Sequence, residues 1–376
     1  MANDSIIDGG GASRLSRIDG FMVYADQALQ NMTEGMQKGV VQPRVLMAKA
    51  LPQIQSQIVD AAEDSAFWKP IENMPDEFAA EDRERLTAAF REAIESKIIP
   101  AYQRVANFVG DEYMAAARDT VGLYALPDGR EWYAYNVRRI TTTDLTPEEI
   151  HQIGLDEVAR IHEEMRGVMD EVGFEGDLME FFDFMNNDDQ FYFDAPEQLI
   201  QGYRDMSDRI SELAKELFNV FPKTGFEVRR VEPFREASAS GGSYRTGTPD
   251  GKRPGVFYAN AYDIKARPIW GMESLFLHEA IPGHHFQRSL QVENEELPGF
   301  RRIGGYTAFT EGWGLYAERL AWEMGLLEDP YDDIGRLQAE LFRAVRLVVD
   351  TGIHDQHWTR EQAIQYLIAQ QRFLGQ

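Results

Sequence analysis

Residues Leu275 to Gln287 read L-F-L-H-E-A-I-P-G-H-H-F-Q, and this stretch is the most informative part of the chain. It holds three of the seven histidines, His278, His284 and His285, and Glu279 directly follows the first of them. Two imidazoles beside a carboxylate are the groups that a zinc site with a general base requires. The stretch therefore predicts a metal site, with His278 as one ligand and Glu279 as the base.

The stretch departs from the common zinc motif H-E-x-x-H, in which two histidines share one face of a helix. The position of the second histidine is taken by Pro282, and the next histidines come six and seven residues after His278. On an unbroken helix, His285 would return to the same face about 10.5 Å further along the axis. Pro282 and Gly283 can break the helix and return His284 or His285 to the metal. The spacing leaves that choice open, and it also allows a helix that simply ends with surface histidines.

A second motif, T-E-G-W-G-L-Y-A-E at 310–318, supplies carboxylates that could complete the site. Its glutamates, Glu311 and Glu318, are seven residues apart and therefore share one helix face, two turns from each other. Either could reach a metal, and Glu311 follows His278 by 33 residues, a spacing that suits a helical hairpin. The structural alternative for Glu318 is an ion pair with Arg319 or Arg302.

With these two motifs the chain resembles the bacterial family described as domain of unknown function 885. The other matching segments are D-L-T-P-E-E-I-H-Q-I-G-L (144–155), D-G-K-R-P-G-V-F-Y-A-N (250–260), V-V-D-T-G-I-H (348–354) and W-T-R-E-Q-A (358–363). The resemblance covers most of the chain from about residue 100 onward. Such proteins look like zinc metallopeptidases of the gluzincin type, similar to thimet oligopeptidase and carboxypeptidase Taq. Family members are usually longer at both ends, which allows this chain to be a fragment of a longer one.

The resemblance implies a role for each residue of the two motifs. It makes His278, His284 and Glu311 the ligands of one zinc ion, with Glu279 as the general base. Other divalent metals, such as manganese, cobalt or iron, would suit the same ligands. His285 and Glu318 then lie behind the ligands or replace one of them.

Further candidates lie outside the two motifs. The candidates for stabilising the oxyanion are Tyr258, Tyr262 and His354. Arg346, Asp350 and His354 recur every four residues and would align on a continuing helix. Arg346 and Asp350, together with Tyr244, are the candidates for binding substrate. The structural alternative for the aligned row is a surface ion-pair ladder, worth about 0.3–0.5 kcal/mol per pair.

Composition limits the class of protein. The 376 residues are 43% apolar and 11% aromatic, so the chain can bury a large core. The net charge of −25 would repel phosphate backbones and anionic membrane surfaces, so no nucleic-acid partner is expected. The chain has no cysteine, which excludes disulfides and thiol catalysis. No run approaches the roughly 18 apolar residues of a membrane span, so no membrane insertion is expected.

The N-terminal residues 1–13, M-A-N-D-S-I-I-D-G-G-G-A-S, are predicted to be a flexible leader without apolar periodicity. They lack the basic and apolar regions of a signal peptide. The compartment is left open, because the family resemblance allows a periplasmic, secreted or cytoplasmic protein. The oligomeric state is also left open.

Residues 14–376 are predicted to form a single, mainly α-helical domain, with its catalytic part from about residue 225. Strand-like alternation at 228–231 and 255–262, around a Pro- and Gly-rich turn, predicts a small antiparallel sheet beside the active-site cleft. The resemblance implies that the large helical body is zincin-like. Residues 122–143, with the turn P-D-G and several aromatics, are predicted to be a loop or short strands.

These features predict a zinc-dependent hydrolase, most simply a peptidase that cleaves a peptide or small amide with metal-activated water. One alternative is a helical binding or scaffold protein with a structural or vestigial metal site, which a fourth protein ligand would close. Another is a metal hydrolase of non-peptide esters or amides, which the sequence does not separate from a peptidase.

Overall fold

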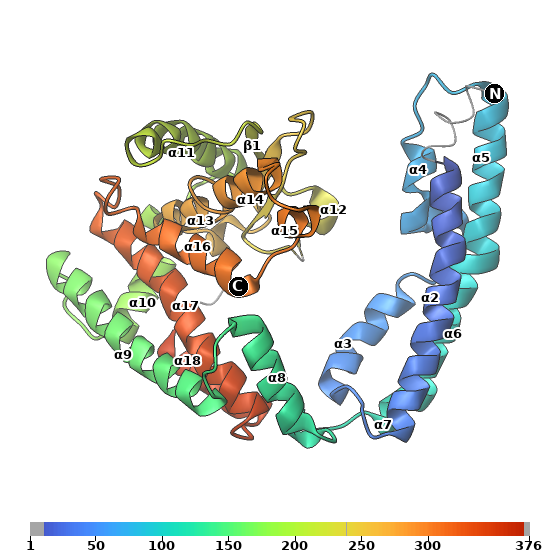
Figure 1. The fold of residues 1–376 in the computed structure, drawn as a ribbon, viewed down its shortest axis with the longest axis horizontal. Helices are drawn as coiled ribbons and strands as arrows, with labels where there is room; N and C mark the ends of the chain where they lie inside the picture. The colour runs from blue at the N-terminus through green and yellow to red at the C-terminus, as the bar shows by residue number, and fades with distance from the viewer. Residues whose placement is uncertain (1–10, 238, 372–376) are drawn as a thin grey trace. The chain divides into compact units, whose positions relative to one another are not determined.

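The computed structural model of the chain describes residues 11–237 and 239–371 and is mainly helical, as predicted (Figure 1). It divides into two compact units, residues 1–129 and 130–376. The sequence predicted one domain over 14–376, whereas each unit has hydrophobic clusters of its own. Of the predicted leader, residues 1–10 lie outside the described residues, and residues 11–13 begin the first described helix.

The N-terminal unit is built from helices that bury their apolar faces against one another. Its helices are α2 (Gly11–Gln37), α3 (Arg44–Gln55), α4 (Lys69–Glu72), α5 (Ala80–Ala93), α6 (Ile99–Asn107) and α7 (Met114–Ala116). In Figure 1, α2 runs beside α5 and α6, and the buried side chains between them include Ile18, Ala93 and Ile98. None of the candidate site residues lies in this unit.

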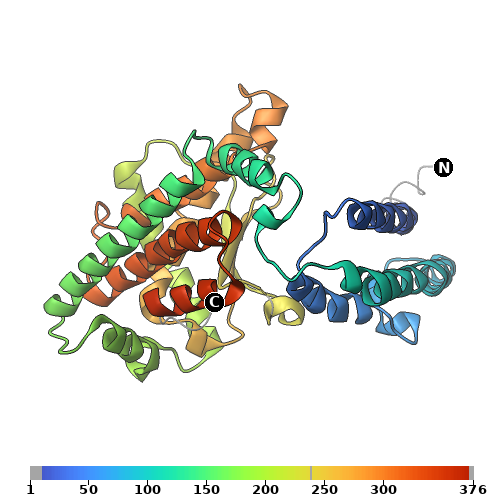
Figure 2. The same cartoon turned by 90° about the horizontal axis from the view of Figure 1, so that it is seen from below.

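Long helices form the frame of the C-terminal unit. They are α8 (Gly129–Thr141), α9 (Pro147–Glu171), α10 (Leu178–Asn187), α11 (Pro196–Leu217), α17 (Pro330–His354) and α18 (Arg360–Gln370). Helix α9 begins at a capping box, in which the side chain of Thr146 accepts from the amide of Glu149 and the Glu149 carboxylate accepts from the amide of Thr146. Helices α9 and α17 lie side by side (Figure 2), with Ile161, Met165 and Leu341 in their shared core.

Helix α8 replaces the loop or strands predicted for residues 122–143. The turn P-D-G is present just before it, with Asp128 at a φ of 53°. Beyond that turn, Tyr133 and Val137 are buried four residues apart, as one face of a helix requires. Packing of this face therefore outweighs the strand preference of its aromatic residues.

The sheet has three strands, β1 (Phe226–Arg230), β2 (Gly242–Arg245) and β3 (Gly255–Ala259), in the order β1-β3-β2. Strands β2 and β3 are antiparallel, but β1 and β3 are parallel, so the predicted antiparallel sheet is in fact mixed. The prediction paired β1 with β3 as a hairpin. The chain between them instead contains α12 (Pro233–Glu236) and β2, and β2 takes the hairpin position.

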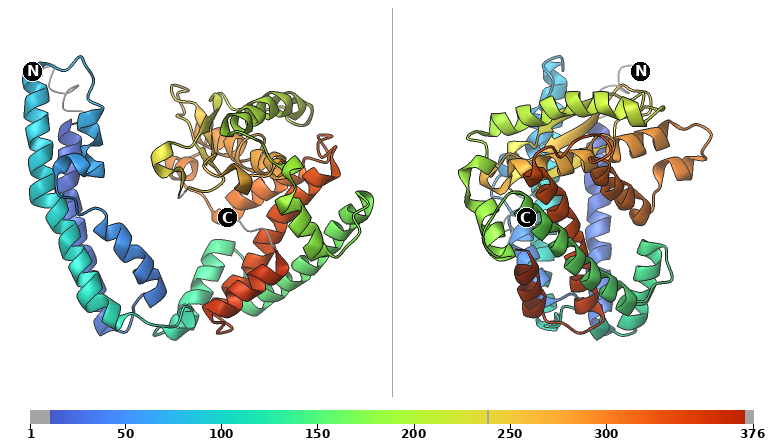
Figure 3. Two further views of the ribbon diagram at one scale, coloured as in Figure 1. Left: turned by 180° about the vertical axis from the view of Figure 1, so that it is seen from behind. Right: turned by 90° about the vertical axis from the view of Figure 1, so that its left-hand side faces the viewer.

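The central strand β3 is buried on both faces, and its alternating side chains enter two clusters. Phe257 and Ala259 pack with Tyr203 of α11 and Phe276 of α13 (Met272–Glu279). Figure 3 shows α11 running across the sheet. Burial of a side chain such as Phe276 contributes about 1.5–3 kcal/mol. This packing holds α13 in place, and α13 ends with His278 and Glu279, the first two residues of the predicted metal site.

Three further helices complete the region around α13. They are α14 (His284–Glu293), α15 (Gly299–Ile303) and α16 (Thr307–Arg319). The side chain of Gln287 on α14 donates to the carbonyl of Phe309 on α16, 3.0 Å away, which joins these two helices. Among the helices of the described residues, none has both the length and the apolar character needed to cross a bilayer.

Candidate metal centre

The chain breaks between α13 and α14, at the Pro-Gly pair where the sequence predicted a break. The peptide bond before Pro282 is cis, and Gly283 lies so close to α13 that a Cβ there would be 1.9 Å from the backbone oxygen of His278. The indole nitrogen of Trp313 donates to the carbonyl of Pro282 at 2.9 Å and ties the break to α16. As a result, the rings of His278 and His284 face each other edge-on, with centroids 4.6 Å apart.

His278, His284 and Glu311 converge, as the sequence predicted for the three ligands. One ligand atom from each lies within 4.8 Å of the other two. Glu311 Oε2 is 3.4 Å from Nε2 of His278, and Oε1 is 3.8 Å from Nε2 of His284. The Nδ1 atom of His284 is buried without a hydrogen-bond partner among the described residues. Two imidazoles and a carboxylate, one imidazole otherwise unsatisfied, are a donor set that fits a zinc ion.

The three residues have very different proton affinities. Burial opposes protonation of His278, but hydrogen bonds to Glu311 and Glu318 outweigh it and raise the pKa of His278 to about 9. Burial, and then the charge of His278, lower the pKa of His284 to about 4. The hydrogen bond with His278 lowers the pKa of Glu311. Near neutral pH and without an ion, His284 is a neutral imidazole and Glu311 a carboxylate, so both are ready to ligate. His278 is instead a charged imidazolium, which must lose one of its two ring protons before it can ligate.

Glu318 lies behind His278 and is only 2% exposed. Its Oε1 is 2.7 Å from Nδ1 of His278, and Ser274 donates to its Oε2 at 2.8 Å. Because a carboxylate only accepts, this contact places the imidazole proton on Nδ1 and leaves Nε2 facing Glu311. Among the described residues, its ion pair is with Arg343 on α17, at 3.1 Å, and not with Arg302 or Arg319 as the alternative expected. Glu318 thus orients His278, one of the roles that the sequence left open.

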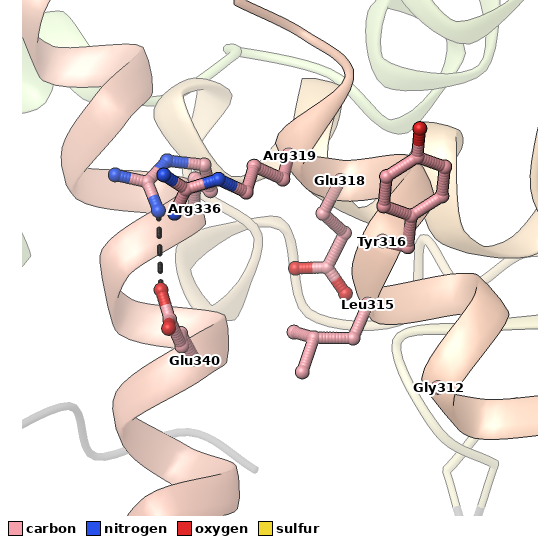
Figure 4. Close-up of a pocket in the computed structure, with 7 residues that line it drawn as sticks. All are labelled: Gly312, Leu315, Tyr316, Glu318, Arg319, Arg336 and Glu340. Carbon is pink, nitrogen blue, oxygen red and sulfur yellow. Dashed lines mark hydrogen bonds and ion pairs between the residues drawn. The ribbon is translucent and has the colours of Figure 1, made fainter. Parts of the chain in front are cut away.

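Glu318 is also one of the residues that line a small cavity between α16 and α17 (Figure 4). This cavity has a volume of about 260 Å³. Its lining consists of Gly312, Leu315, Tyr316, Glu318, Arg319, Arg336 and Glu340. Arg336 and Glu340 form an ion pair at 3.1 Å within α17. Glu318 is therefore shared by this cavity and the contact with His278.

Glu279 is partly buried at the end of α13, next to His278 in the chain and beside strand β2. Burial raises the pKa of its carboxyl, while the charge of His278 and the backbone amide of Tyr244 oppose that rise. Strand β2 is an edge strand, and the bond from the amide of Asn260 to the carbonyl of Gly241 sets its pairing pattern with β3. In that pattern the peptide groups of Tyr244 point to the open edge. Glu279 therefore lies at the open edge of β2, where it accepts from the amide of Tyr244.

His285 points away from the three convergent residues and is buried beneath β2. Its Nδ1 is 3.0 Å from the hydroxyl of Tyr244 and 3.3 Å from that of Ser289, and its ring packs on Phe226. Burial lowers the pKa of His285 to about 4. The structure therefore places His284, rather than His285, with His278. The hydroxyl of Tyr244, predicted to bind substrate, is instead used inside the protein.

The two other tyrosine candidates lie away from the convergent residues. Tyr258 points to the face of β3 opposite α13, where it packs with Val231 and under the guanidinium of Arg235. Its neighbour in the strand, Phe257, points toward α13 instead, because successive side chains of a strand alternate between the two faces of the sheet. Tyr262 is 62% exposed, and no hydrogen bond joins it to the candidate ligands among the described residues.

The predicted row on α17 forms a separate cluster. Asp350 accepts from the hydroxyl of Tyr133 at 2.7 Å and lies 3.7 Å from His354. Arg346 is exposed, with its guanidinium over the ring of Phe342. The helix does continue through Gly352, so the row aligns as predicted. Asp350 and His354 are, however, two and three turns beyond Arg343, about 10 and 16 Å along the axis.

The sequence analysis missed two side chains at the site, Ser274 and Arg343. Ser274 precedes His278 by four residues on α13, and this helical spacing could have revealed it. Arg343 comes from α17, 65 residues after His278, and carries no local signal. Only the packing of α17 against α13 and α16 brings it to Glu318.

Fold and site together define a mainly helical protein with a mixed three-stranded sheet and a candidate metal centre of two histidines and one glutamate. The chain belongs to the family described as bacterial protein of unknown function (DUF885), whose sequence profile matches residues 11–373. This confirms the family that the two motifs indicated. Comparison with curated proteins gives no match.

Five solved chains match this chain, among them the following two. One is "the putative lipoprotein from Colwellia psychrerythraea", with a TM-score of 0.89 and 35% identity over 95% of this chain. The other is "a putative lipoprotein of unknown function from Shewanella oneidensis", with a TM-score of 0.64 and 18% identity over 97% of this chain. The match covers 62% of the first protein and 67% of the second, and the second likeness concerns the fold alone. The chain thus spans less than two thirds of the length of the first.

Proposed function

We propose that this protein is a zinc-dependent hydrolase, most simply a peptidase. The observation that carries the proposal is the convergence of His278, His284 and Glu311, with one ligand atom of each within 4.8 Å. Glu279 directly follows the first of these ligands, as a general base does in helical zinc motifs. The resemblance to zinc metallopeptidases of the gluzincin type supports the same assignment.

In the proposed reaction, His278, His284 and Glu311 hold the ion and Glu279 moves the proton. A bound zinc ion would polarise the substrate carbonyl and lower the pKa of a water molecule toward about 7. The Glu279 carboxylate takes a proton from the attacking water and passes it to the leaving nitrogen. Burial raises the pKa of this carboxyl, which brings its proton affinity closer to that of the groups it serves.

The edge strand beside Glu279 supports a peptide as the substrate class. The amide of Tyr244 on β2 is bonded to Glu279, and its carbonyl points to the open edge of the sheet, where an extended chain can add as a further strand. Main-chain pairing of this kind would present a peptide bond next to Glu279. A small non-peptide ester or amide would gain nothing from such an edge. We therefore favour a peptidase over a metal hydrolase of non-peptide esters or amides.

The second candidate function is a binding or scaffold protein with a structural or vestigial metal site. Structural zinc sites are usually closed by four protein ligands. His285 is the histidine next to His284 in the chain, but its Nδ1 is held by Tyr244 and Ser289. Among the described residues the cluster contains three ligands, which favours a site open to water and substrate.

The experiment that tests the proposal is the substitution Glu279→Gln. Zinc content, measured by elemental analysis, should stay near one ion per chain, while hydrolysis of a peptide library should fall by about 100-fold or more. Glu295→Gln, the same change at an exposed glutamate, is the matched control and should leave both unchanged. Hydrolysis retained in Glu279→Gln would remove Glu279 as the base, and a wild-type chain that binds no added zinc would refute the proposal.

A further inference from the structure

Arg343 of α17 reaches the candidate metal centre from behind. Its Nη2 lies 3.1 Å from Oε1 of Glu318 and 3.0 Å from Nδ1 of His278. Its Nη1 donates to the backbone carbonyl of Ala339, four residues earlier on the same helix, at 2.9 Å. The side chain is about one third exposed, whereas Glu318 is buried. The guanidinium is thus held at one end by its own helix and meets Glu318 at the other.

Glu318 needs a positive partner because it is buried. A carboxylate removed from water is unfavourable unless it is paired and hydrogen-bonded. The groups that satisfy it are Ser274 on Oε2 and both His278 and Arg343 on Oε1. Of these, the guanidinium is always charged, since arginine does not lose its proton in proteins. Arg343 therefore provides the permanent countercharge of Glu318.

The same contacts decide where the proton of His278 lies. Both Arg343 and a protonated Nδ1 are donors, so they do not bond each other, and each can donate to Oε1 of Glu318. With one proton held on Nδ1, the ring turns Nε2 toward Glu311, which lies 3.4 Å away. Without this countercharge the carboxylate of Glu318 would no longer be held against Nδ1, and the tautomer of His278 would no longer be fixed.

We propose that Arg343 is a positioning residue of the metal centre. It neutralises Glu318 and holds it in place, so that Glu318 fixes the Nδ1 proton of His278 and Nε2 remains directed at the metal. This inference rests on the proposed function, because it takes His278 as a metal ligand. It goes beyond that function because it makes zinc binding depend on Arg343, a residue of α17 that touches neither the ion nor the substrate.

The test compares zinc affinities of the full chain, measured by competition with a chromophoric chelator. Arg343→Met should bind zinc about tenfold more weakly, in line with losses seen when partners of ligands are removed. Arg343→Lys keeps the charge and should recover affinity to within about threefold of wild type. Arg346→Met is the matched control, since Arg346 lies one turn further along α17 in contact with Phe342, and it should bind as wild type.

A second readout separates positioning from a general loss of structure. In protein labelled with ¹⁵N-histidine, wild-type His278 should show the tautomer with its proton on Nδ1 at a pH above its pKa. Arg343→Met should show a mixture of tautomers, whereas Arg343→Lys and Arg346→Met should not. If the methionine variant does not fold by circular dichroism, Arg343→Gln takes its place, with the same expectations.

The outcomes distinguish this inference from the proposed function. A wild-type chain that binds zinc, together with a neutral Arg343 variant that binds it equally tightly with an unchanged tautomer, overturns the inference alone. Arg343→Lys as weak as the neutral variant also overturns it, because the charge is then not what matters. A wild-type chain that binds no zinc refutes the proposed function itself.

Discussion

Gly314 of α16 lies directly against the imidazole ring of His278. A Cβ at position 314 would be 2.4 Å from Cε1 of that ring, a separation that carbon atoms do not adopt without movement. The requirement for glycine is steric, because the contact is with a side chain from another helix. Gly314 is therefore what allows α16 to approach α13 closely enough for Glu311 and Glu318 to reach His278.

This contact predicts that Gly314→Ala weakens zinc binding by about tenfold or more, because the methyl group must displace the ring of a ligand. The competition assay with a chelator measures the effect. Gly312→Ala on the same helix is the control, since a Cβ there meets nothing within 4 Å. Alanine at that exposed helical position should stabilise the protein by up to about 1 kcal/mol and leave zinc affinity unchanged. Unchanged affinity in Gly314→Ala would contradict the packing.

Adjacent histidines at 284 and 285 should respond differently to substitution. His284→Ala removes a ligand and should abolish measurable zinc binding at stoichiometric concentrations. His285→Ala removes a buried ring that contacts Tyr244, Ser289 and Phe226, so it should keep the metal but lower the free energy of unfolding by about 2 kcal/mol. Elemental analysis and urea denaturation give the two readouts. The reverse result, metal lost only in His285→Ala, would exchange the two assignments.

The local arrangement of the candidate site was predictable from the sequence, but its wider surroundings were not. The pair His278-Glu279, the break at Pro282-Gly283 and the carboxylate of Glu311 are readable because helical periodicity and proline geometry act over a few residues. The choice between His284 and His285 depends on the dihedral angles within the break, which the spacing does not specify. The contact of Arg343 with Glu318 depends on how α17 packs, and no short motif encodes that.

The fold shows the same division. The capping boxes at Thr146 and Thr359 mark the starts of α9 and α18, and each is a four-residue pattern that is visible in the sequence. The pairing of β1 was not predictable from its alternation, since a strand read from its own residues does not reveal whether its neighbour is parallel. Tyr258 was wrongly expected at the site, because the sequence does not show which face of a strand packs on a particular helix. Its side of β3 depends on which face packs on α13, and Phe276 takes the face of Phe257.

Asp332, in the first turn of α17, should limit stability at alkaline pH. Burial, and then the charge of Glu273, raise the pKa of Asp332 to about 7. A carboxyl with a raised pKa in the folded state binds more protons there than when unfolded, so stability falls as the pH rises from about 4 to 7. Asp332→Asn should therefore stabilise the protein at pH 8, by about 1 kcal/mol after allowing for solvent screening, and not at pH 4.

Thermal denaturation at the two pH values measures the effect of Asp332→Asn. Asp333→Asn, the same change one residue later, is the matched control, because Asp333 is buried in an ion pair with Arg336 at 2.7 Å. Breaking that pair should destabilise the protein at pH 8 by about 2 kcal/mol or more. A melting temperature of Asp332→Asn below that of wild type at pH 8 would contradict the raised pKa.

Zinc binding should release a proton from His278. The pKa of His278 is raised to about 9, that of His284 is lowered to about 4, and that of Glu311 is also lowered. Between about pH 5 and 9, two of the ligands are thus ready for the ion, and only His278 must lose a proton to bind it. Zinc affinity should therefore rise with pH, because a proton and the zinc ion compete for the same nitrogen of His278.

The affinity for zinc should consequently rise about tenfold per pH unit up to about pH 9 and then level off. Calorimetric titration at pH 7.5, in two buffers with different ionisation enthalpies, should show about one proton released per zinc bound. In Glu318→Gln the acceptor for Nδ1 loses its charge, which lowers the pKa of His278 and should reduce the proton release at that pH. The same variant should bind zinc about 10- to 100-fold more weakly above pH 9, where proton competition has ended and only the orientation of the ring still differs. Equal proton release in wild type and Glu318→Gln would show that Glu318 does not control the proton on His278.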